Sequence, residues 1–210
     1  MEGSNTYPVK LSVDYPDREL NRLTTFFRMF TIIPIAIILG LVSAASYRWE
    51  GQKGTNYQYA AGGLVVAATV LMILFRQKYP RWWFDWNAAL INFGTRVSAY
   101  MALLRDEYPS TDEEQAVHIT IPYPNVKEEL NRWLPLVKWL LAIPHYVVLA
   151  FLGIGVIVSV IIAWFAILFN GRYPRSLFDY VVGVMRWSLR VTAYAGILVT
   201  DIYPPFSLDE

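Results

Sequence analysis

The same ordered set of short motifs occurs twice in this chain. Glu19-Leu20-Asn21-Arg22 returns as Glu129-Leu130-Asn131-Arg132, and an apolar run with one proline, Pro34 or Pro144, follows each copy. The later motifs recur in the same order: Tyr79-Pro80-Arg81, Phe84-Asp85, Arg96-Val97, Ala99-Tyr100, Asp106 and Tyr108-Pro109, then Tyr173-Pro174-Arg175, Phe178-Asp179, Arg190-Val191, Ala193-Tyr194, Asp201 and Tyr203-Pro204. Such a parallel duplication predicts two similar units, residues 1–109 and 118–210, joined by a polar link at 110–117.

The composition is typical of a membrane protein. Hydrophobic residues make up 55% of the chain and charged residues 17%, whereas soluble domains are about 25% charged. Residues 139–169 contain His145 and Ser159 but no Asp, Glu, Lys or Arg. Apolar runs of about 18 or more residues indicate membrane spans, and the first run lies too far from Met1 for a signal peptide. The absence of cysteine excludes disulfides and thiol chemistry.

We predict four membrane-spanning helices in two hairpins, at about 25–47, 59–76, 131–152 and 154–170. Two parallel copies would be related by a pseudo-two-fold axis along the membrane normal. The second hairpin is divided at Gly153 and Gly155, because one helix over 139–169 would be about 46 Å long in a hydrocarbon core of about 30 Å. A single long bent helix or a shallow re-entrant hairpin remains the alternative.

Basic residues predict the orientation. All of the 18 lysines and arginines except Arg48 and Lys53 fall on the side of the two termini. Cytoplasmic segments carry such an excess of positive charge. We therefore expect an integral protein of the bacterial inner membrane with both termini in the cytoplasm.

Each hairpin is followed by Tyr-Pro-Arg and a predicted amphipathic helix, at 81–104 and 175–200. Charged residues recur at helical spacing along one face of each, which suits the membrane interface. The candidate stripe consists of Asp85, Arg96, Asp179, Arg186 and Arg190. The alternative is that the stripe makes internal Asp–Arg contacts between the copies. Alternating apolar residues at 9–13 and 119–121 predict short strands before each hairpin.

Small residues at a spacing of four mark candidate helix-packing faces. They are Ala36, Gly40 and Ala44, then Gly63 and Ala67, then Gly155, Ser159 and Ala163. Small residues at this spacing let helices approach closely. The pattern therefore favours a compact bundle or docking to partner helices.

Residues able to carry chemistry are few. The predicted spans contain no Asp or Glu, and Arg28 and Lys138 lie near span ends, where they can snorkel to the surface. The two histidines, His118 and His145, are too few for a histidine metal site, and we expect an interfacial hydrogen bond for His145. No nucleotide-binding, hydrolase or metalloprotease motif is present. We expect no enzyme activity, no cofactor, no metal and no nucleic-acid partner.

Four stretches resemble the DUF4389 family of bacterial membrane proteins. They are Tyr-Pro-Val-Lys-Leu-Ser-Val-Asp-Tyr-Pro at 7–16, Leu-Ala-Ile-Pro-His-Tyr-Val-Val-Leu at 141–149, Gly-Arg-Tyr-Pro-Arg-Ser-Leu-Phe-Asp at 171–179 and Tyr-Pro-Pro-Phe-Ser-Leu at 203–208. The resemblance implies a polytopic membrane protein with two tandem copies, and it implies no activity. Ile33-Pro34-Ile35-Ala36 stands where the second copy has Ile143-Pro144-His145-Tyr146, which argues against a role that needs two histidines.

These observations favour a non-catalytic accessory or structural protein. It would pack against a larger membrane complex or against itself, or organise membrane lipids. A small transporter, channel or lipid-translocating protein is one alternative, supported by the duplication but not by membrane-embedded charge. An enzyme acting on lipid at the interface is the other, and only the charged stripes would supply its chemistry.

Overall fold

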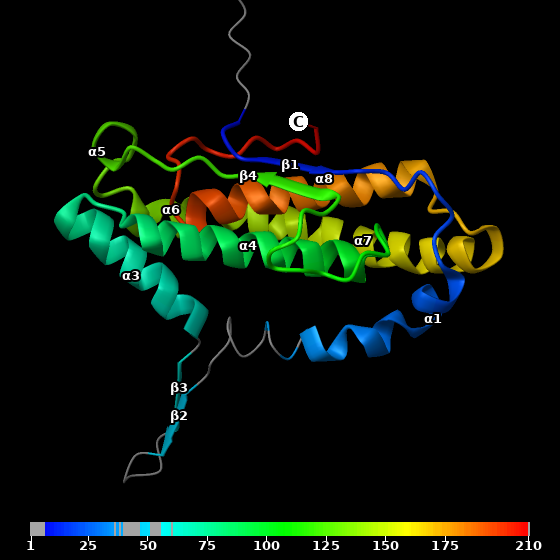
Figure 1. Ribbon diagram of the computed structural model, residues 1–210. Helices are drawn as coiled ribbons and strands as arrows, with labels where there is room; N and C mark the ends of the chain where they lie inside the picture. Colours follow the sequence, from blue (N-terminus) through cyan, green and yellow to red (C-terminus); the bar gives the residue numbers. More distant parts are fainter. Residues whose placement is uncertain are drawn as a thin grey trace, which may run out of the picture.

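The computed structural model describes residues 7–35, 37, 39, 47–50, 56–59 and 61–209. Helices dominate the described residues, with two small two-stranded sheets. The elements, drawn in Figure 1, are β1 (Lys10–Val13), α1 (Arg22–Thr31), β2 (Tyr47–Glu50), β3 (Asn56–Tyr59), α3 (Ala61–Arg76), α4 (Arg81–Met101), β4 (Val117–Thr120), α5 (Val126–Glu129), α6 (Pro135–Leu141), α7 (Ile143–Asn170), α8 (Arg175–Val191) and the π-helix η1 (Thr192–Gly196).

Local sequence explains where several helices begin and end. Asn21 caps α1, because its side-chain oxygen accepts hydrogen bonds from the amides of Leu23 and Thr24 at 3.0 and 3.3 Å. Extended prolines precede α4 and α8, so each helix starts at the arginine of a Tyr-Pro-Arg motif. Gly171 ends α7 in the left-handed conformation, with φ of 71°, which glycine adopts without a steric penalty.

The prediction of four spans in two hairpins is wrong. Helix α7 continues through Gly153 and Gly155 for 28 residues, and no other helix among the described residues is long and apolar enough to cross a membrane. Each glycine costs a helix only about 1 kcal/mol, whereas a break in an apolar setting would leave backbone groups unpaired. The second hairpin is therefore one helix, in keeping with the long-helix alternative.

The described part of the first expected hairpin contains no helix long enough to span a membrane. Helix α1 has 10 residues and α3 has 16, and residues 36, 38, 40–46, 51–55 and 60 of this region lie outside the described part. The polar segment between them is bordered by β2 and β3, which pair antiparallel from Tyr47 with Tyr59 to Glu50 with Asn56.

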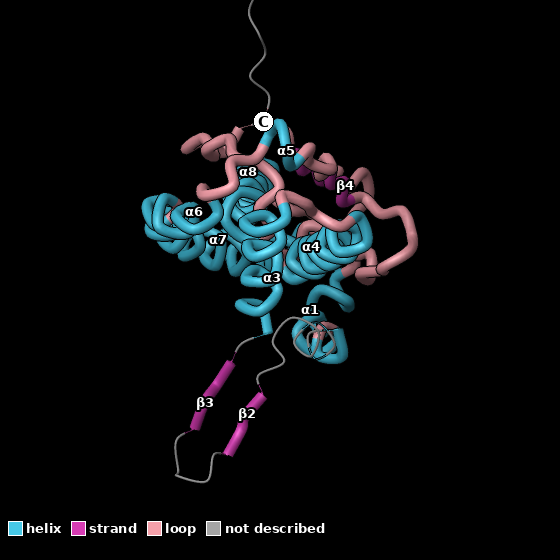
Figure 2. The backbone as a smooth tube through the Cα atoms, turned by 90° about the vertical axis from the view of Figure 1, so that its left-hand side faces the viewer, coloured by secondary structure: helices cyan, strands magenta, loops and turns pink. Residues whose placement is uncertain are grey.

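The alternating segments form β1 and β4, which pair antiparallel across the two halves of the chain. Leu11 lies opposite Ile119 in this register, and each of the two residues lies four positions before a Tyr-Pro pair. Strands β1 and β4 and the C-terminal segment lie above α4 and α8, whereas α1, β2 and β3 lie below them (Figures 1 and 2). Helix α3 slopes downward from the level of α4 (Figure 1).

The main core is built from both halves of the sequence. Val9, just before β1, and Leu11 of β1 are 1% and 2% exposed. They belong to the same buried cluster as Leu104, Ile167 and Val181, each fully buried. Burial of apolar surface at about 25 cal/mol per Å² is the main favourable term in such packing. The two halves therefore share one core, and the boundaries at 109 and 118 remain a sequence prediction.

Candidate functional site

Each half of the chain buries one cation beside one carboxylate. Arg28 of α1 pairs with Asp106 through Nη2 and Oδ1, and Lys138 of α6 pairs with Asp201 at 2.7 Å between Nζ and Oδ1. The cationic side chains are only 4% and 0% exposed. The sequence predicts snorkelling for Arg28 and Lys138, but the structure buries both. Sequence reasoning missed these pairs, although both members recur at equivalent positions in the two copies.

The same carboxylates also bind the backbone shortly before the helix that carries each cation. The second oxygen of Asp106 accepts a hydrogen bond from the amide of Asn21 at 2.7 Å, and that of Asp201 accepts from Asn131 at 2.6 Å. Burial lowers the pKa of Lys138, and the hydrogen bond and charge of Asp201 oppose this shift. Removing one partner of a buried ion pair typically costs about 3–5 kcal/mol.

The two cations also make matching contacts with tyrosine and backbone. Arg28 donates to the carbonyl oxygen of Tyr100 at 3.1 Å and lies 4.4 Å from the centre of its ring. Lys138 donates to the carbonyl oxygen of Thr200 at 2.6 Å and lies 5.0 Å from the ring of Tyr194. Cation–π contact adds to the ion pair in a desolvated site. The carboxylates and backbone carbonyls bind the charged ends of both side chains, which argues against an acid–base role.

Tyrosines from two of the Tyr-Pro pairs contact the opposite half of the chain. Tyr15 lies edge-on to Phe178 with ring centres 5.0 Å apart, and Tyr123 lies edge-on to Phe84 at 5.1 Å. Each hydroxyl donates to the carbonyl oxygen of the tyrosine that precedes the contacted helix. Tyr15, which precedes the first Glu-Leu-Asn-Arg motif, thus contacts the second half of the chain. Tyr123, which precedes the second such motif, contacts the first half.

His145 is a buried hydrogen-bond acceptor in an aromatic cluster. Its Nδ1 accepts from Nε1 of Trp187 at 3.0 Å, and its ring stacks on Phe206 with centres 4.0 Å apart. The equivalent residues of the first half are apolar, Ile35 and Phe93, and they belong to one hydrophobic cluster. A polar pair in one half therefore replaces an apolar pair in the other, which favours a packing role for His145.

The two acids of the candidate stripe lie at the surface. Asp85 contacts Arg81 and Asp179 contacts Arg175, each at 3.2 Å and one helical turn apart. The aspartate side chains are 55% and 57% exposed. Exposed pairs of this kind contribute about 0.3–0.5 kcal/mol. The structure thus pairs Asp179 with Arg175, an arginine outside the predicted stripe.

The stripe arginines bind backbone carbonyls. Their acceptors are Ser110 for Arg96 at 2.7 Å, Leu11 and Leu208 for Arg186 at 3.1 and 3.0 Å, and Ser207 for Arg190 at 3.3 Å. Arg186 and Arg190 therefore hold the C-terminal segment against α8, and Arg186 also reaches β1. Arg190 is only 3% exposed.

The small-residue positions fall in different surroundings. Gly155 faces Tyr180 of α8 so closely that an added Cβ would lie 2.3 Å from the phenol oxygen. The other positions are Ser159 and Ala163, which are buried, Ala67, which is exposed, Gly63, which lies in α3, and Ala36, Gly40 and Ala44, which lie outside the described residues. The Gly155 face therefore packs within the chain.

Helix α7 carries several large apolar side chains that are exposed. Phe151, Ile157 and Phe169 are 71%, 61% and 75% exposed, although α7 contacts both α1 and α8. Soluble monomers rarely expose contiguous apolar patches larger than a few hundred Å². Exposed apolar patches mark protein or membrane interaction sites.

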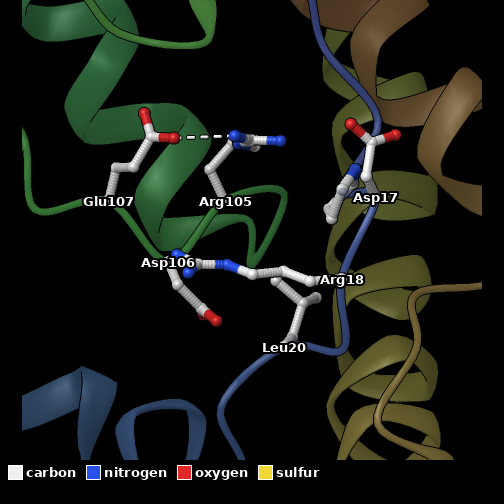
Figure 3. Close-up of a pocket in the computed structure, with 7 residues that line it drawn as sticks. Asp17, Arg18, Leu20, Arg105, Asp106 and Glu107 are labelled. Carbon is white, nitrogen blue, oxygen red and sulfur yellow. Dashed lines mark hydrogen bonds and ion pairs between the residues drawn. The ribbon is translucent and has the colours of Figure 1, made fainter.

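A polar cleft of about 270 Å³ lies at the first half's ion pair. Asp17 and Arg18 line one side, and Arg105 and Glu107 line the other (Figure 3). Arg105 contacts Glu107 at 2.6 Å. Burial alone would raise the pKa of Glu107, but this hydrogen bond and one from the amide of Ala116 lower it. Within the described ranges no three His, Cys, Asp or Glu residues come together as a metal site.

The comparisons with known proteins identify one family. Residues 133–207 match the family model described as a domain of unknown function (DUF4389). No curated protein and no solved structure matches the chain. The matched segment begins just before α6 and contains α7, α8, the Lys138–Asp201 pair and the His145 cluster. Residues 133–207 of this chain are therefore a DUF4389 domain, as the resemblance of its motifs predicts.

Proposed function

We propose that this protein is a non-catalytic membrane protein in which α7 and its neighbouring helices lie in lipid. It organises lipid or packs against other membrane subunits. The observation that carries the proposal is the exposure of α7. This 28-residue helix is long and apolar enough to cross a membrane, and little of its most apolar part is covered by the rest of the chain.

Helix α7 fits neither a soluble core helix nor a signal sequence. A core helix of a soluble protein would be mostly buried, but Ile154, Ile157 and Val158 of α7 are 59%, 61% and 50% exposed. A signal sequence lies near an N-terminus, whereas α7 begins at Ile143. Lipid or another apolar protein surface is the remaining partner for this helix.

Exposed aromatic residues near α7 support a lipid contact. Trp133, just before α6, and Trp139, within α6, are 65% and 58% exposed, and Phe26 and Phe30 are 52% and 68% exposed on α1. Phe26 also stacks on Trp164 of α7 with ring centres 6.1 Å apart. Tryptophan is enriched at the level of lipid headgroups. Helices α1, α6 and α7 therefore form one candidate membrane-facing surface.

The acidic and basic groups support a structural role. The buried cations are paired with Asp106 and Asp201, and the arginines of α8 hold backbone carbonyls. The orientation predicted from four spans does not carry over to one long helix, because basic residues flank α7 at both ends, with Lys138 before it and Arg172 after it. Matched contacts in the two halves support the interpretation that the repeated motifs form two copies of one unit.

Flotation of the purified chain with phospholipid vesicles tests the proposal. The wild type should float and should resist alkaline carbonate extraction. Replacing Ile154 and Ile162 with lysine should release the protein, because a central lysine costs about 2.5–3.5 kcal/mol in a membrane helix. Thr120→Lys, at an exposed position on β4, is the control and should float normally. A wild-type protein that stays folded in buffer without lipid or detergent would refute the proposal.

A further inference from the structure

A cavity of about 650 Å³ opens between α1, the end of α4 and α7. Its floor contains Thr25 and Arg28, which are 1% and 3% exposed, and its rim contains Met101, Ile157 and Ile161, which are 55%, 61% and 52% exposed. The volume lies within the range of about 300–1,000 Å³ that is usual for ligand sites. The rim residues of α7 belong to the apolar surface described above, so the cavity continues that surface inward.

Two buried hydrogen-bond donors at the floor lack an acceptor within the described part of the chain. They are the hydroxyl of Thr25 and Nε of Arg28. Other threonine hydroxyls of α1 are satisfied, since Thr24 donates to Asn21 and Thr31 donates to Arg28. Buried polar groups in folded proteins are normally paired. A ligand in this cavity could therefore supply the oxygen acceptor that Thr25 and Arg28 lack.

The charge at the floor selects a neutral acceptor. Asp106 already neutralises Arg28, so a second anion there would be an uncompensated buried charge. Asp106 also lines the polar cleft of Figure 3, whereas Arg28 lines the apolar cavity. The ion pair thus marks a boundary between polar and apolar surroundings. A ligand that matches both sides has an apolar chain, a neutral carbonyl and a polar end.

We propose that this cavity holds one acyl chain of a membrane phospholipid, with the ester carbonyl oxygen accepting hydrogen bonds from Thr25 and from Nε of Arg28. The proposal rests on the proposed membrane function, because the cavity opens on the α7 surface assigned to lipid. The acyl chain lies against Val156, Val160 and the rim of α7, and the headgroup lies on the side of the polar cleft.

The second half lacks this arrangement. Pro135 stands at the position equivalent to Thr25, so the hydroxyl donor is absent there. The ammonium of Lys138 is occupied by Asp201 and the carbonyl of Thr200. The cavity of about 390 Å³ near Tyr146 and Thr192 includes neither Pro135 nor Lys138 among its lining residues. We therefore expect one such phospholipid per chain.

Photocrosslinking tests the proposal directly. The full chain is placed in nanodiscs with a phosphatidylcholine that carries a diazirine in one acyl chain, and crosslinked peptides are located by mass spectrometry. We expect crosslinks to concentrate at Met101 and residues 156–164. Val160→Trp fills the cavity and should remove these crosslinks. The matched control is Val158→Trp on the same helix, at a position that is 50% exposed and does not line the cavity.

A second pair of variants tests the carbonyl contact. Thr25→Val keeps the side-chain shape but removes the hydroxyl, and retention of the phospholipid during detergent exchange should fall roughly two- to tenfold. Thr25→Ser should restore retention. Uniform crosslinking along the exposed face of α7 that Val160→Trp does not change, together with equal retention in Thr25→Val, would overturn the proposal. Flotation with vesicles reports the proposed membrane function separately, and Val160→Trp and Thr25→Val should both float.

Discussion

Exchanging the His145–Trp187 pair for its apolar counterpart tests the packing role of His145 most directly. The first half has Ile35 and Phe93 at the equivalent positions, so His145→Ile and Trp187→Phe together rebuild a pair that this fold already accommodates. His145 is 0% exposed and Trp187 is 5% exposed. The hydrogen bond between them, at 3.0 Å, is therefore formed in the interior.

The two single variants should be less stable than the wild type. His145→Ile leaves the indole N–H of Trp187 without an acceptor, and a buried unsatisfied donor costs about 1–3 kcal/mol. It also removes the ring stack on Phe206, where the centres lie 4.0 Å apart, a contact worth about 0.5–1.5 kcal/mol. Part of this cost is offset, because Nε2 of His145 has no partner among the described residues. We expect a net loss of about 1–3 kcal/mol.

The double variant should recover part of that loss, because neither polar group remains. A coupling free energy of about 1–3 kcal/mol between the two sites is expected from a double-mutant cycle. For a chain of this size, 1 kcal/mol corresponds to roughly 2–4 °C in the thermal midpoint. The assay is thermal unfolding in detergent or nanodiscs, followed by near-ultraviolet circular dichroism.

The reciprocal exchange in the first half is the control for this cycle. Ile35→His alone should destabilise the protein, and adding Phe93→Trp should restore stability. Purely additive effects in both halves would refute the argument that the histidine and the tryptophan are retained as a pair. A stable His145→Ile variant that lost a cellular phenotype would instead favour a functional role for the imidazole.

Further predictions concern the charged residues and the orientation. Asp106→Asn and Asp201→Asn should each lower stability by about 3–5 kcal/mol, since each leaves a buried cation unpaired; unchanged thermal midpoints would contradict the buried pairs. Asp179→Ala should change stability by no more than about 0.5 kcal/mol, and a larger loss would show a contact beyond its exposed ion pair. The hydrogen bonds of Glu107 lower its pKa below the ordinary 4.5, so its contribution is present above that value and is lost as the pH falls through the lowered pKa. Glu107→Gln should therefore reduce the acid-side pH dependence of the thermal midpoint. A cysteine at Ser207, alone in a chain without native cysteine, should react with a membrane-impermeant maleimide from one side of sealed vesicles only, and equal labelling from both sides would contradict a single orientation.

Local motifs predicted some elements well and the long helix poorly. The Tyr-Pro-Arg motifs mark the first residues of α4 and α8 because proline restricts the chain just before each helix. Period-two alternation marks β1 and β4 because one side of each strand is buried. Gly153 and Gly155 do not end a helix, because Tyr180 of α8, far along the chain, packs against Gly155 and donates to the carbonyl of Leu152 at 2.9 Å. A tertiary contact of this kind leaves no local signature.

The buried ion pairs were missed for a related reason. Viewed locally, Arg28 and Lys138 are long side chains near the ends of apolar runs, where snorkelling is the usual outcome. Their partners, Asp106 and Asp201, lie near the end of the same repeat, and only the fold brings the two positions together. Each pair nevertheless recurs as a whole in the duplicated sequence. Recurrence of both charges was therefore a signal that the pairs interact.

Differences between matched positions of the two halves distinguish packing contacts from the proposed lipid contact. Where both members of a contact change together, as His145 and Trp187 do relative to Ile35 and Phe93, each half keeps its own complementary interior. Such a paired change needs no ligand. Thr25 differs from its counterpart without a compensating partner among the described residues, and its hydroxyl stays unpaired at the floor of a cavity. A one-sided difference that leaves a buried donor unsatisfied is costly unless another molecule supplies the acceptor. This contrast favours the first half, rather than both, as the site of the proposed phospholipid contact.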